Sequence, residues 1–293
     1  MVKDVSSGCC MELDELKSFL DNAHDLFQGV DGEGKIVYVN KAWLDSLEYD
    51  KEEVMGKNIF TFIAPDSLDH CLKKFEHLMN GGKLVNLEVT FLTKSGGRII
   101  AEGNVVLIHR ADGSFFTRGI FRDITERREL EKNIFHLATH DALTDLMNRH
   151  AFMDCLAKDM EYAKRYGQKI AIVYFDLDRF KQINDSFGHA AGDAVLVAVA
   201  NRLKAYMRGS DYAVRFGGDE FGLAIKSISS QEISVVVNRL TEAVTEPIIF
   251  SGHTLTVGMS VGLAIYPDDA QKAEELIRLA DAKMYGNKAR QRD

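Results

Sequence analysis

The segment Arg215-Phe216-Gly217-Gly218-Asp219-Glu220-Phe221 places two glycines and two acids between two apolar runs. The flanking runs, Tyr212–Phe216 and Phe221–Ile225, have the length and apolar content of strands, and paired glycines are a turn signal. We therefore expect a β-hairpin that presents both acids at its turn. Taken alone, this pattern fits an ordinary solvent-exposed hairpin with surface acids better than it fits a functional site.

A second acidic pair changes this interpretation. Asp176 and Asp178 directly follow Ile170–Phe175, a continuous apolar run of the kind found in strands buried on both faces. Ligands of α/β sheets bind at the carboxyl ends of central strands. If this strand neighbours the hairpin, three or four carboxylates converge at one edge. Such a cluster needs a cation, and oxygen ligands favour Mg²⁺ or Mn²⁺, the metals typical of phosphoryl and nucleotidyl transfer.

The segments around these acids alternate between helix and strand patterns. We expect helices over residues 151–166, 191–207, 231–244 and 273–288, and a further strand over residues 255–266. The second half of the chain is therefore predicted to be an α/β domain with a mixed sheet.

The segment after Asp178 carries groups suited to a nucleotide. The Asn184 amide and the Asp193 carboxylate have the chemistry to address a guanine edge, and Lys181 supplies positive charge for a phosphate. Gly188 and Gly192 leave room for a ring or for backbone. The structural alternative is that Asn184 caps a helix and Asp193 lies in its first turn.

Together these segments resemble the GGDEF family of diguanylate cyclases over about residues 140–293. The resemblance is carried by Asp141–Arg149, Phe175–Asp178, Asn184–Asp193, Arg215–Phe221, Ser260–Pro267 and Ala280–Tyr285. It implies a nucleotidyl-cyclase-like fold and the condensation of two GTP molecules into cyclic di-GMP with release of pyrophosphate. Because each domain of the family binds one GTP, the resemblance also implies a homodimer.

The resemblance further implies roles for individual residues. Asp176, the Leu177 carbonyl, Asp219 and Glu220 would hold the metal. Asp219 would help to deprotonate the 3′-hydroxyl, Glu220 would add negative charge, and Lys288 would stabilise the transition state. The substrate-binding residues would be Asn184, Asp193, Lys181, Phe180 and Arg292. The family often closes with Gly-Arg-Asn, whereas this chain closes with Arg290-Gln291-Arg292-Asp293, so Arg292 is expected in place of a phosphate-facing arginine.

A further segment is similar to the product-inhibition site of the family. Arg208-Gly209-Ser210-Asp211 has the form R-x-x-D shortly before the hairpin, and Arg239 is a candidate second contact. An arginine fork can address guanine and phosphate together. The structural alternative is a surface salt bridge.

The first half of the chain, residues 12–123, resembles a PAS domain. The resemblance rests on Gly34–Asn40, Glu52–Lys57 and Phe121–Thr125. Strands over residues 26–30, 36–39, 85–93, 98–108 and 114–123, with a helix over residues 67–79, predict a five-stranded antiparallel sheet with helices on one face. The fold class is therefore α/β (α+β), a PAS sensor joined to the cyclase domain at residues 141–293.

The ligand of the PAS domain is an open question for the sequence. His77 lies on the expected helix before Gly81-Gly82, near the position where haem-binding PAS domains keep an axial histidine, which makes it a possible haem ligand, and His70 is a weaker candidate. A surface or half-buried histidine is the more ordinary interpretation. No cysteine context indicates a flavin adduct.

Residues 124–140 between the two domains are predicted to form a charged helical linker. Leu130, Ile134 and Leu137 follow the 4-3 spacing of a short coiled-coil seam, although a helix packed on its own domain fits as well.

Composition narrows the function classes. The formal net charge of −8 argues against binding to a nucleic-acid polymer, which needs positive charge against phosphates. The four cysteines lack metal-site spacing, and no apolar run approaches the length of a membrane span. We expect a cytoplasmic diguanylate cyclase regulated by its PAS domain. The alternatives are a non-catalytic receptor for GTP or cyclic di-GMP, and a structural dimerisation module.

Overall fold

The computed structural model describes residues 13–227 and 230–290. The chain divides into two compact units, one ending at Lys132 and one beginning at Asn133. Each unit is described by itself. The predicted start of the first domain, residue 12, lies outside the described residues.

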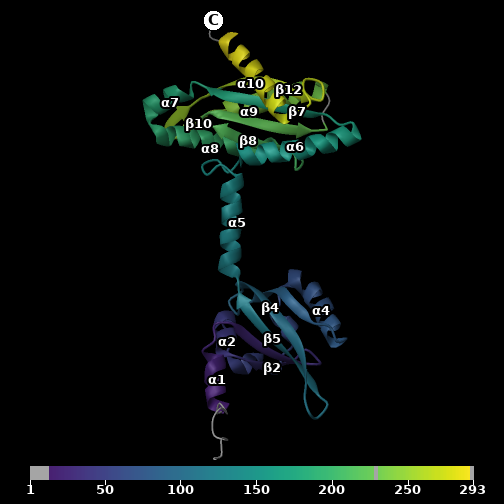
Figure 1. The fold of residues 1–293 in the computed structure, drawn as a ribbon. Helices are drawn as coiled ribbons and strands as arrows, with labels where there is room; N and C mark the ends of the chain where they lie inside the picture. Colours follow the sequence, from purple (N-terminus) through teal and green to yellow (C-terminus); the bar gives the residue numbers. More distant parts are fainter. Residues whose placement is uncertain (1–12, 228–229, 291–293) are drawn as a thin grey trace, which may run out of the picture. The chain divides into compact units, whose positions relative to one another are not determined.

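The first unit is built on a five-stranded antiparallel sheet in the order β2-β1-β5-β4-β3. Its strands are β1 (Leu26–Asp31), β2 (Ile36–Val39), β3 (Leu84–Leu92), β4 (Arg98–His109) and β5 (Phe115–Asp123). Its helices are α1 (Leu13–Asp21), α2 (Lys41–Leu47), α3 (Lys51–Val54), a 3₁₀ turn (Ile59–Phe62) and α4 (Pro65–Met79), several of which are labelled in Figure 1. The antiparallel sheet predicted from the sequence is confirmed.

The core of this unit forms because alternate strand residues point to the side that carries the helices. Trp43 of α2 is fully buried, and its ring meets Phe62 and Phe91 edge to face at 5.7 and 6.3 Å between centroids. Asn40 is buried at the start of α2. Its side-chain oxygen accepts from the backbone N–H groups of Trp43 and Phe27, so it joins the helix to β1.

The second unit has a five-stranded sheet in the order β12-β7-β9-β8-β6. The strands are β6 (Met147–Asn148), β7 (Ile170–Asp178), β8 (Tyr212–Gly217), β9 (Glu220–Lys226) and β12 (Gly258–Tyr266). β6 pairs with β8 in parallel, whereas the other neighbours are antiparallel. The predicted mixed sheet is therefore confirmed.

Helices pack on both faces of this sheet (Figure 1). They are α6 (Arg149–Tyr166), α7 (Phe180–Phe187), α8 (His189–Tyr206), α9 (Ser230–Thr245) and α10 (Ala273–Arg290). Side chains of α6 and α10 share one core with Ile172 and Tyr174, while those of α8 and α9 share another with Val173 and Phe175. Because β7 faces an apolar layer on each side, its sequence is continuously apolar.

The structure differs from the sequence prediction in three places. β7 continues to Asp178, so both aspartates belong to the strand. A separate helix, α7, precedes α8, and Asn184 lies inside it without capping it. The strand expected over residues 255–266 is divided, because β11 (His253–Leu255) pairs with β10 (Ile248–Phe250) whereas β12 pairs with β7.

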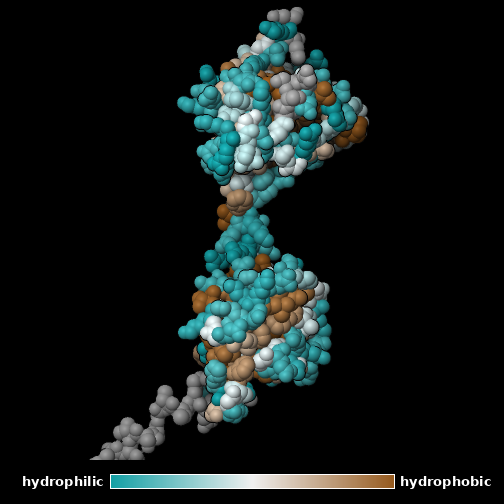
Figure 2. Space-filling view, turned by 90° about the vertical axis from the view of Figure 1, so that its right-hand side faces the viewer, coloured by the Kyte–Doolittle hydropathy of each residue, from teal (hydrophilic) through white to brown (hydrophobic). Residues whose placement is uncertain are grey.

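Helix α5 (Thr125–Thr139) connects the two sheets in the sequence and has no buried residue. At its start, Asp123 accepts from the backbone N–H of Thr125 at 2.8 Å. Leu130, Ile134 and Leu137 of the predicted seam are 54–65% exposed, and apolar patches interrupt the hydrophilic surface of this helix in Figure 2. Among the described helices, none is long and apolar enough to cross a membrane.

Candidate active site

The hairpin formed by β8 and β9 turns at Gly217 and Gly218, whose φ angles are 146° and 55°. These positive φ values explain the two glycines, because side chains with a Cβ rarely adopt them. Arg215 secures the turn: its Nε and Nη2 donate to the Gly218 carbonyl at 3.0 and 2.9 Å. Its Nη1 donates to Asp141 at 3.0 Å.

The Arg215–Asp141 pair joins residues 74 positions apart in the chain. Neither residue was expected to have a role, although both lie in segments that carry the family resemblance. Asp141 also accepts from the Thr144 backbone N–H and hydroxyl at 2.9 and 2.6 Å. Burial works against ionisation of Asp141, but the bonds from Thr144 and Arg215 outweigh it and hold its pKa below the ordinary value. The contact therefore acts as a fixed brace beneath the hairpin.

The acids of the hairpin meet the end of β7. Asp176 lies opposite Glu220 in the antiparallel register, and the Leu177 N–H donates to the Asp219 carbonyl at 3.2 Å. Burial, together with the neighbouring Asp219 and Asp178 carboxylates, raises the pKa of Asp176 against the opposing effect of Lys288. The strand register thus places Asp176, Asp219 and Glu220 at one edge of the sheet, as the sequence predicted.

Lys288 of α10 contributes a positive charge to this edge. Its Nζ forms an ion pair with Oδ1 of Asp176, and both side chains are largely buried. The ammonium group therefore compensates part of the negative charge that the acids create.

Two hydroxyl groups orient the remaining carboxylates. Tyr174 donates to Oε2 of Glu220 at 2.9 Å, and Ser260 of β12 donates to Oδ1 of Asp178 at 2.8 Å. Burial and the Glu220 carboxylate raise the pKa of Tyr174, so its phenol remains a donor at neutral pH.

A cleft of about 890 Å³ opens beside Asp178 and Asp219, whereas Asp176 and Glu220 are not among the residues that line it. Its lining includes Leu177, Asp178, Arg179, Phe180, Lys181, Gln182, Asp185, Asp219, Thr256, Val257, Gly258 and Lys288. The cleft thus unites acidic and basic side chains named from the sequence. Arg179, which sequence reasoning did not select, adds a further cation and has a φ of 64° at the start of α7.

Asn184 and Asp193 do not line this cleft in the structure. The Asn184 carboxamide oxygen is buried and has no hydrogen-bond partner among the described residues. A Cβ added at Gly192 would lie 2.0 Å from that oxygen. Asp193 is exposed on α8. An orphaned buried acceptor is costly, so the Asn184 oxygen suits a ligand donor.

The donor set at the acidic edge fits a hard divalent cation in type, because Asp176, Asp219 and Glu220 offer carboxylate oxygens and Leu177 offers a carbonyl. Within the described ranges, however, no three acidic, histidine or cysteine side chains converge closely enough to form a ready cation cage. Lys288 is the cation that contacts Asp176 here. Cation binding at this edge would therefore require the Lys288–Asp176 pair to rearrange.

The R-x-x-D segment lies at a separate small cavity of about 90 Å³, whose lining includes Arg208, Asp211 and Arg239. Asp211 accepts from the backbone N–H groups of Lys226 and Arg208 at 3.1 and 3.3 Å. The Arg239 guanidinium lies 5.9 Å from the centre of the Tyr206 ring. The three residues named from the sequence are therefore brought together.

The histidines named for the PAS domain lie on its surface. His77 and His70 are exposed on α4, whereas Cys71, Phe75 and Leu78 of the same helix line an internal cavity of about 50 Å³. Burial raises the pKa of Cys71 to about 11. This geometry gives no support to haem ligation by His77. Arg292 lies outside the described residues.

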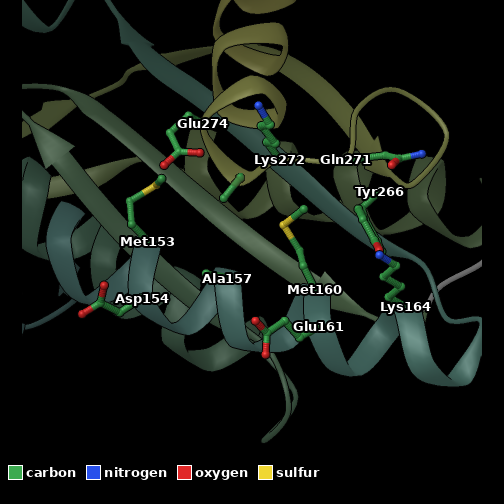
Figure 3. A pocket seen from close by; sticks show the side chains of 11 residues that line it. Met153, Asp154, Ala157, Met160, Glu161, Lys164, Tyr266, Gln271, Lys272 and Glu274 are labelled. Carbon is green, nitrogen blue, oxygen red and sulfur yellow. The ribbon is translucent and has the colours of Figure 1, made fainter.

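A second groove of about 410 Å³ lies between α6 and the first turn of α10. In Figure 3, Met153 and Met160 reach from α6 toward that turn, with Tyr266 at one end and charged groups around the opening. Its lining shares no residue with the cleft beside Asp219.

Comparisons with known proteins identify two domain families in the chain. The family model described as diguanylate cyclase, GGDEF domain, matches residues 138–293, and a PAS domain model matches residues 25–126. The chain is 29% identical to the probable diguanylate cyclase DgcE of Escherichia coli over 98% of its own length and 26% of that protein.

Solved structures of GGDEF-domain proteins are also similar to this chain. A sensory box/GGDEF family protein from Caulobacter crescentus is 38% identical, covering 51% of this chain and 97% of that one, with a TM-score of 0.50. The coiled coil and GGDEF domain of DgcB from the same organism, in complex with c-di-GMP, is 26% identical with a TM-score of 0.52, covering 57% and 88%. The chain spans 20–31% of the length of the first curated relatives that it matches.

Proposed function

This chain belongs to the GGDEF family of diguanylate cyclases and carries a PAS domain, and on this premise we propose that it condenses two GTP molecules into cyclic di-GMP and pyrophosphate. The observation that supports the proposal most directly is the placement of Asp176, Asp219 and Glu220 at one sheet edge, next to a cleft that Asp219, Lys181 and Lys288 line. This pairing of acids with phosphate-compatible bases suits nucleotidyl transfer.

We propose that Asp176, the Leu177 carbonyl, Asp219 and Glu220 hold Mg²⁺ or Mn²⁺. Bound there, the metal would activate the attacking hydroxyl and neutralise charge on the phosphates. Asp219 lines the cleft and accepts the proton of the 3′-hydroxyl. Lys181 and Lys288 neutralise the triphosphate, and Phe180 lines the same cleft.

The guanine contact is assigned to Asn184 and Asp193. The support is the carboxamide oxygen of Asn184, which is buried and has no hydrogen-bond partner among the described residues. In this assignment the Asn184 amide addresses the O6 edge of the base, and the Asp193 carboxylate accepts from N1 and N2. Asp193 lies on the following helix and is exposed for contact with a ligand.

The remaining assignments concern control. Because one domain binds one GTP, the reaction needs a homodimer, and the exposed residues Leu130, Ile134 and Leu137 of α5 are the proposed seam. Product binding at Arg208, Asp211 and Arg239 would inhibit the enzyme. The PAS unit, assigned to residues 12–123 with a linker at residues 124–140, would regulate the cyclase domain at residues 141–293.

The decisive experiment incubates the purified chain with GTP and Mg²⁺ and separates the products by chromatography. We expect cyclic di-GMP and pyrophosphate from the wild type and unchanged GTP from Asp219→Ala. Unchanged GTP from a dimeric wild-type sample would rule the proposal out and would leave a nucleotide receptor as the better description.

A further inference from the structure

Tyr174 is held rigidly next to the acidic edge. It lies on β7 two residues before Asp176, and it is 2% exposed. Its ring stacks on Phe216 with the centroids 4.7 Å apart and the planes at 16°. The Arg149 guanidinium lies over the Phe216 ring at 5.3 Å. This packing leaves the phenol little freedom to move.

The phenol oxygen of Tyr174 donates to Oε2 of Glu220 at 2.9 Å. Glu220 lies directly opposite Asp176 in the strand register, so the two residues are neighbours on one face of the sheet. Like charges placed opposite each other repel, which favours rotation of Glu220 away from this edge. A donor fixed by packing opposes that rotation, because hydrogen bonds to charged acceptors are strong.

We propose that Tyr174 is a positioning residue that orients the Glu220 carboxylate for binding a divalent cation at the edge shared with Asp176. The catalytic consequence rests on the proposed function, whereas cation binding can be measured without turnover. Tyr174 acts through Glu220, since the phenol hydrogen bond ends on that carboxylate.

The test is Tyr174→Phe, which keeps the ring and removes the hydroxyl. Mn²⁺ binding to the full chain is measured by electron paramagnetic resonance of free Mn²⁺, in the presence of a GTP analogue that cannot react. We expect the dissociation constant for Mn²⁺ to rise about tenfold, the usual size of a lost hydrogen bond to a charged group. In steady-state assays kcat should fall while KM for GTP changes little, because the proposed base and phosphate contacts lie on other side chains.

The matched control is Tyr266→Phe, a buried tyrosine of β12 that lines the groove in Figure 3 and not the cleft. It should bind Mn²⁺ as the wild type does. In a Glu220→Gln background, Tyr174→Phe should cause no further loss of Mn²⁺ affinity, because the carboxylate that it orients is gone.

The outcomes separate the two proposals. Wild-type Mn²⁺ affinity in Tyr174→Phe, an equal additional loss in the Glu220→Gln background, or a wild type that binds no Mn²⁺ would each overturn the role of Tyr174. Weakened Mn²⁺ binding in Tyr174→Phe together with a wild type that forms no cyclic di-GMP would support the role and refute the proposed reaction.

Discussion

Gly192 of α8 lies so close to Asn184 of α7 that an added Cβ would stand 2.0 Å from the Asn184 carboxamide oxygen. We expect Gly192→Ala to displace this carboxamide and to raise KM for GTP about 10- to 100-fold, the range for about 1–3 kcal/mol lost at a buried polar contact. Steady-state kinetics measure the effect. Gly286→Ala on α10 is the control, because a Cβ there meets no atom within 4 Å. An unchanged KM in Gly192→Ala would show that Asn184 does not read the base.

The Lys288–Asp176 ion pair predicts that Mg²⁺ binding changes the stability of the second unit more when Lys288 is replaced. Lys288→Met leaves a largely buried carboxylate near Asp178 and Asp219 without its cation, which should cost about 1–3 kcal/mol of unfolding free energy without metal. Adding Mg²⁺ should therefore raise the melting temperature of Lys288→Met more than that of the wild type. Calorimetry with and without EDTA tests this. The control is Lys283→Met on the same helix, whose partner Asp269 lies at 3.1 Å and is more exposed. Equal Mg²⁺ shifts in all three proteins would contradict the prediction.

The Asp141 brace predicts a dependence of stability on pH. Burial opposes the ionised form of Asp141, but hydrogen bonds from Thr144 and Arg215 leave its pKa lowered in the folded state. A lowered carboxyl pKa adds stability above the unfolded value, about 3.9, and this stability is lost as the pH falls through the folded value. In urea unfolding, the wild type should therefore have a higher free energy of unfolding than Asp141→Asn. This difference should be largest at about pH 7 and should shrink below about pH 4.

Glu161→Gln, which removes an exposed acid from the groove in Figure 3, is the surface control for this pH series. The free energy of unfolding of Glu161→Gln should stay close to that of the wild type at every pH of the series. If the free energies of unfolding of the wild type and Asp141→Asn differ equally at neutral and acid pH, the contact with Arg215 does not stabilise the ionised form of Asp141.

Asn40 predicts a large stability effect in the PAS unit. Its side chain also donates to the carbonyl oxygens of Leu20 and Asp25, each at 3.0 Å. Asn40→Ala removes the side-chain donor from the Asp25 carbonyl and the acceptor from two backbone N–H groups, while the Leu20 carbonyl keeps its bond from the Ala23 N–H. We therefore expect a loss of about 2–4 kcal/mol in the unfolding transition of this unit. The control is Asn22→Ala, whose side chain bonds only to exposed Ser18 among the described residues. A loss no greater than that of Asn22→Ala would contradict this prediction.

The seam on α5 can be tested by self-association. Ile134 is 65% exposed and its burial in a dimer would contribute about 1.5–3 kcal/mol, so Ile134→Asn should weaken dimerisation at least tenfold. Sedimentation velocity reports the association constant. Phe135→Asn changes a neighbouring residue that is 69% exposed but lies off the 4-3 spacing, and it should leave the association unchanged. Equal losses in both variants would reject this seam.

Much of the fold followed from the sequence because its signals are local. The continuous apolar run of β7 and the glycines at residues 217 and 218 predicted a buried strand and a hairpin, and both are present. The boundary of β7 was missed because Asp176 and Asp178 are polar strand residues, held in the sheet by pairing with Glu220 and Gly258. Polarity alone does not end a strand whose backbone remains paired.

The sequence predicted which residue types form the candidate site, but it did not predict which of these residues contact one another. Asp176, Asp219 and Glu220 were identified because acids stand at the ends of strands, yet the Lys288 ion pair depends on how α10 packs. Arg215 was missed as a residue with a role because its partner Asp141 is 74 positions away. Such a pair has no local signal, and the parallel pairing of β6 with β8 helps to bring those segments together.

Both strands of the acidic hairpin are interior strands, because β7 borders β9 and β6 borders β8. Because each strand of the hairpin is paired on its outer side and Arg215 bonds to the turn, the hairpin does not open and close like an active-site lid. If the hairpin is this stiff, a signal from elsewhere in the chain has little to reshape in its backbone. Control would then act on how often two such half-sites meet across a shared pair of nucleotides.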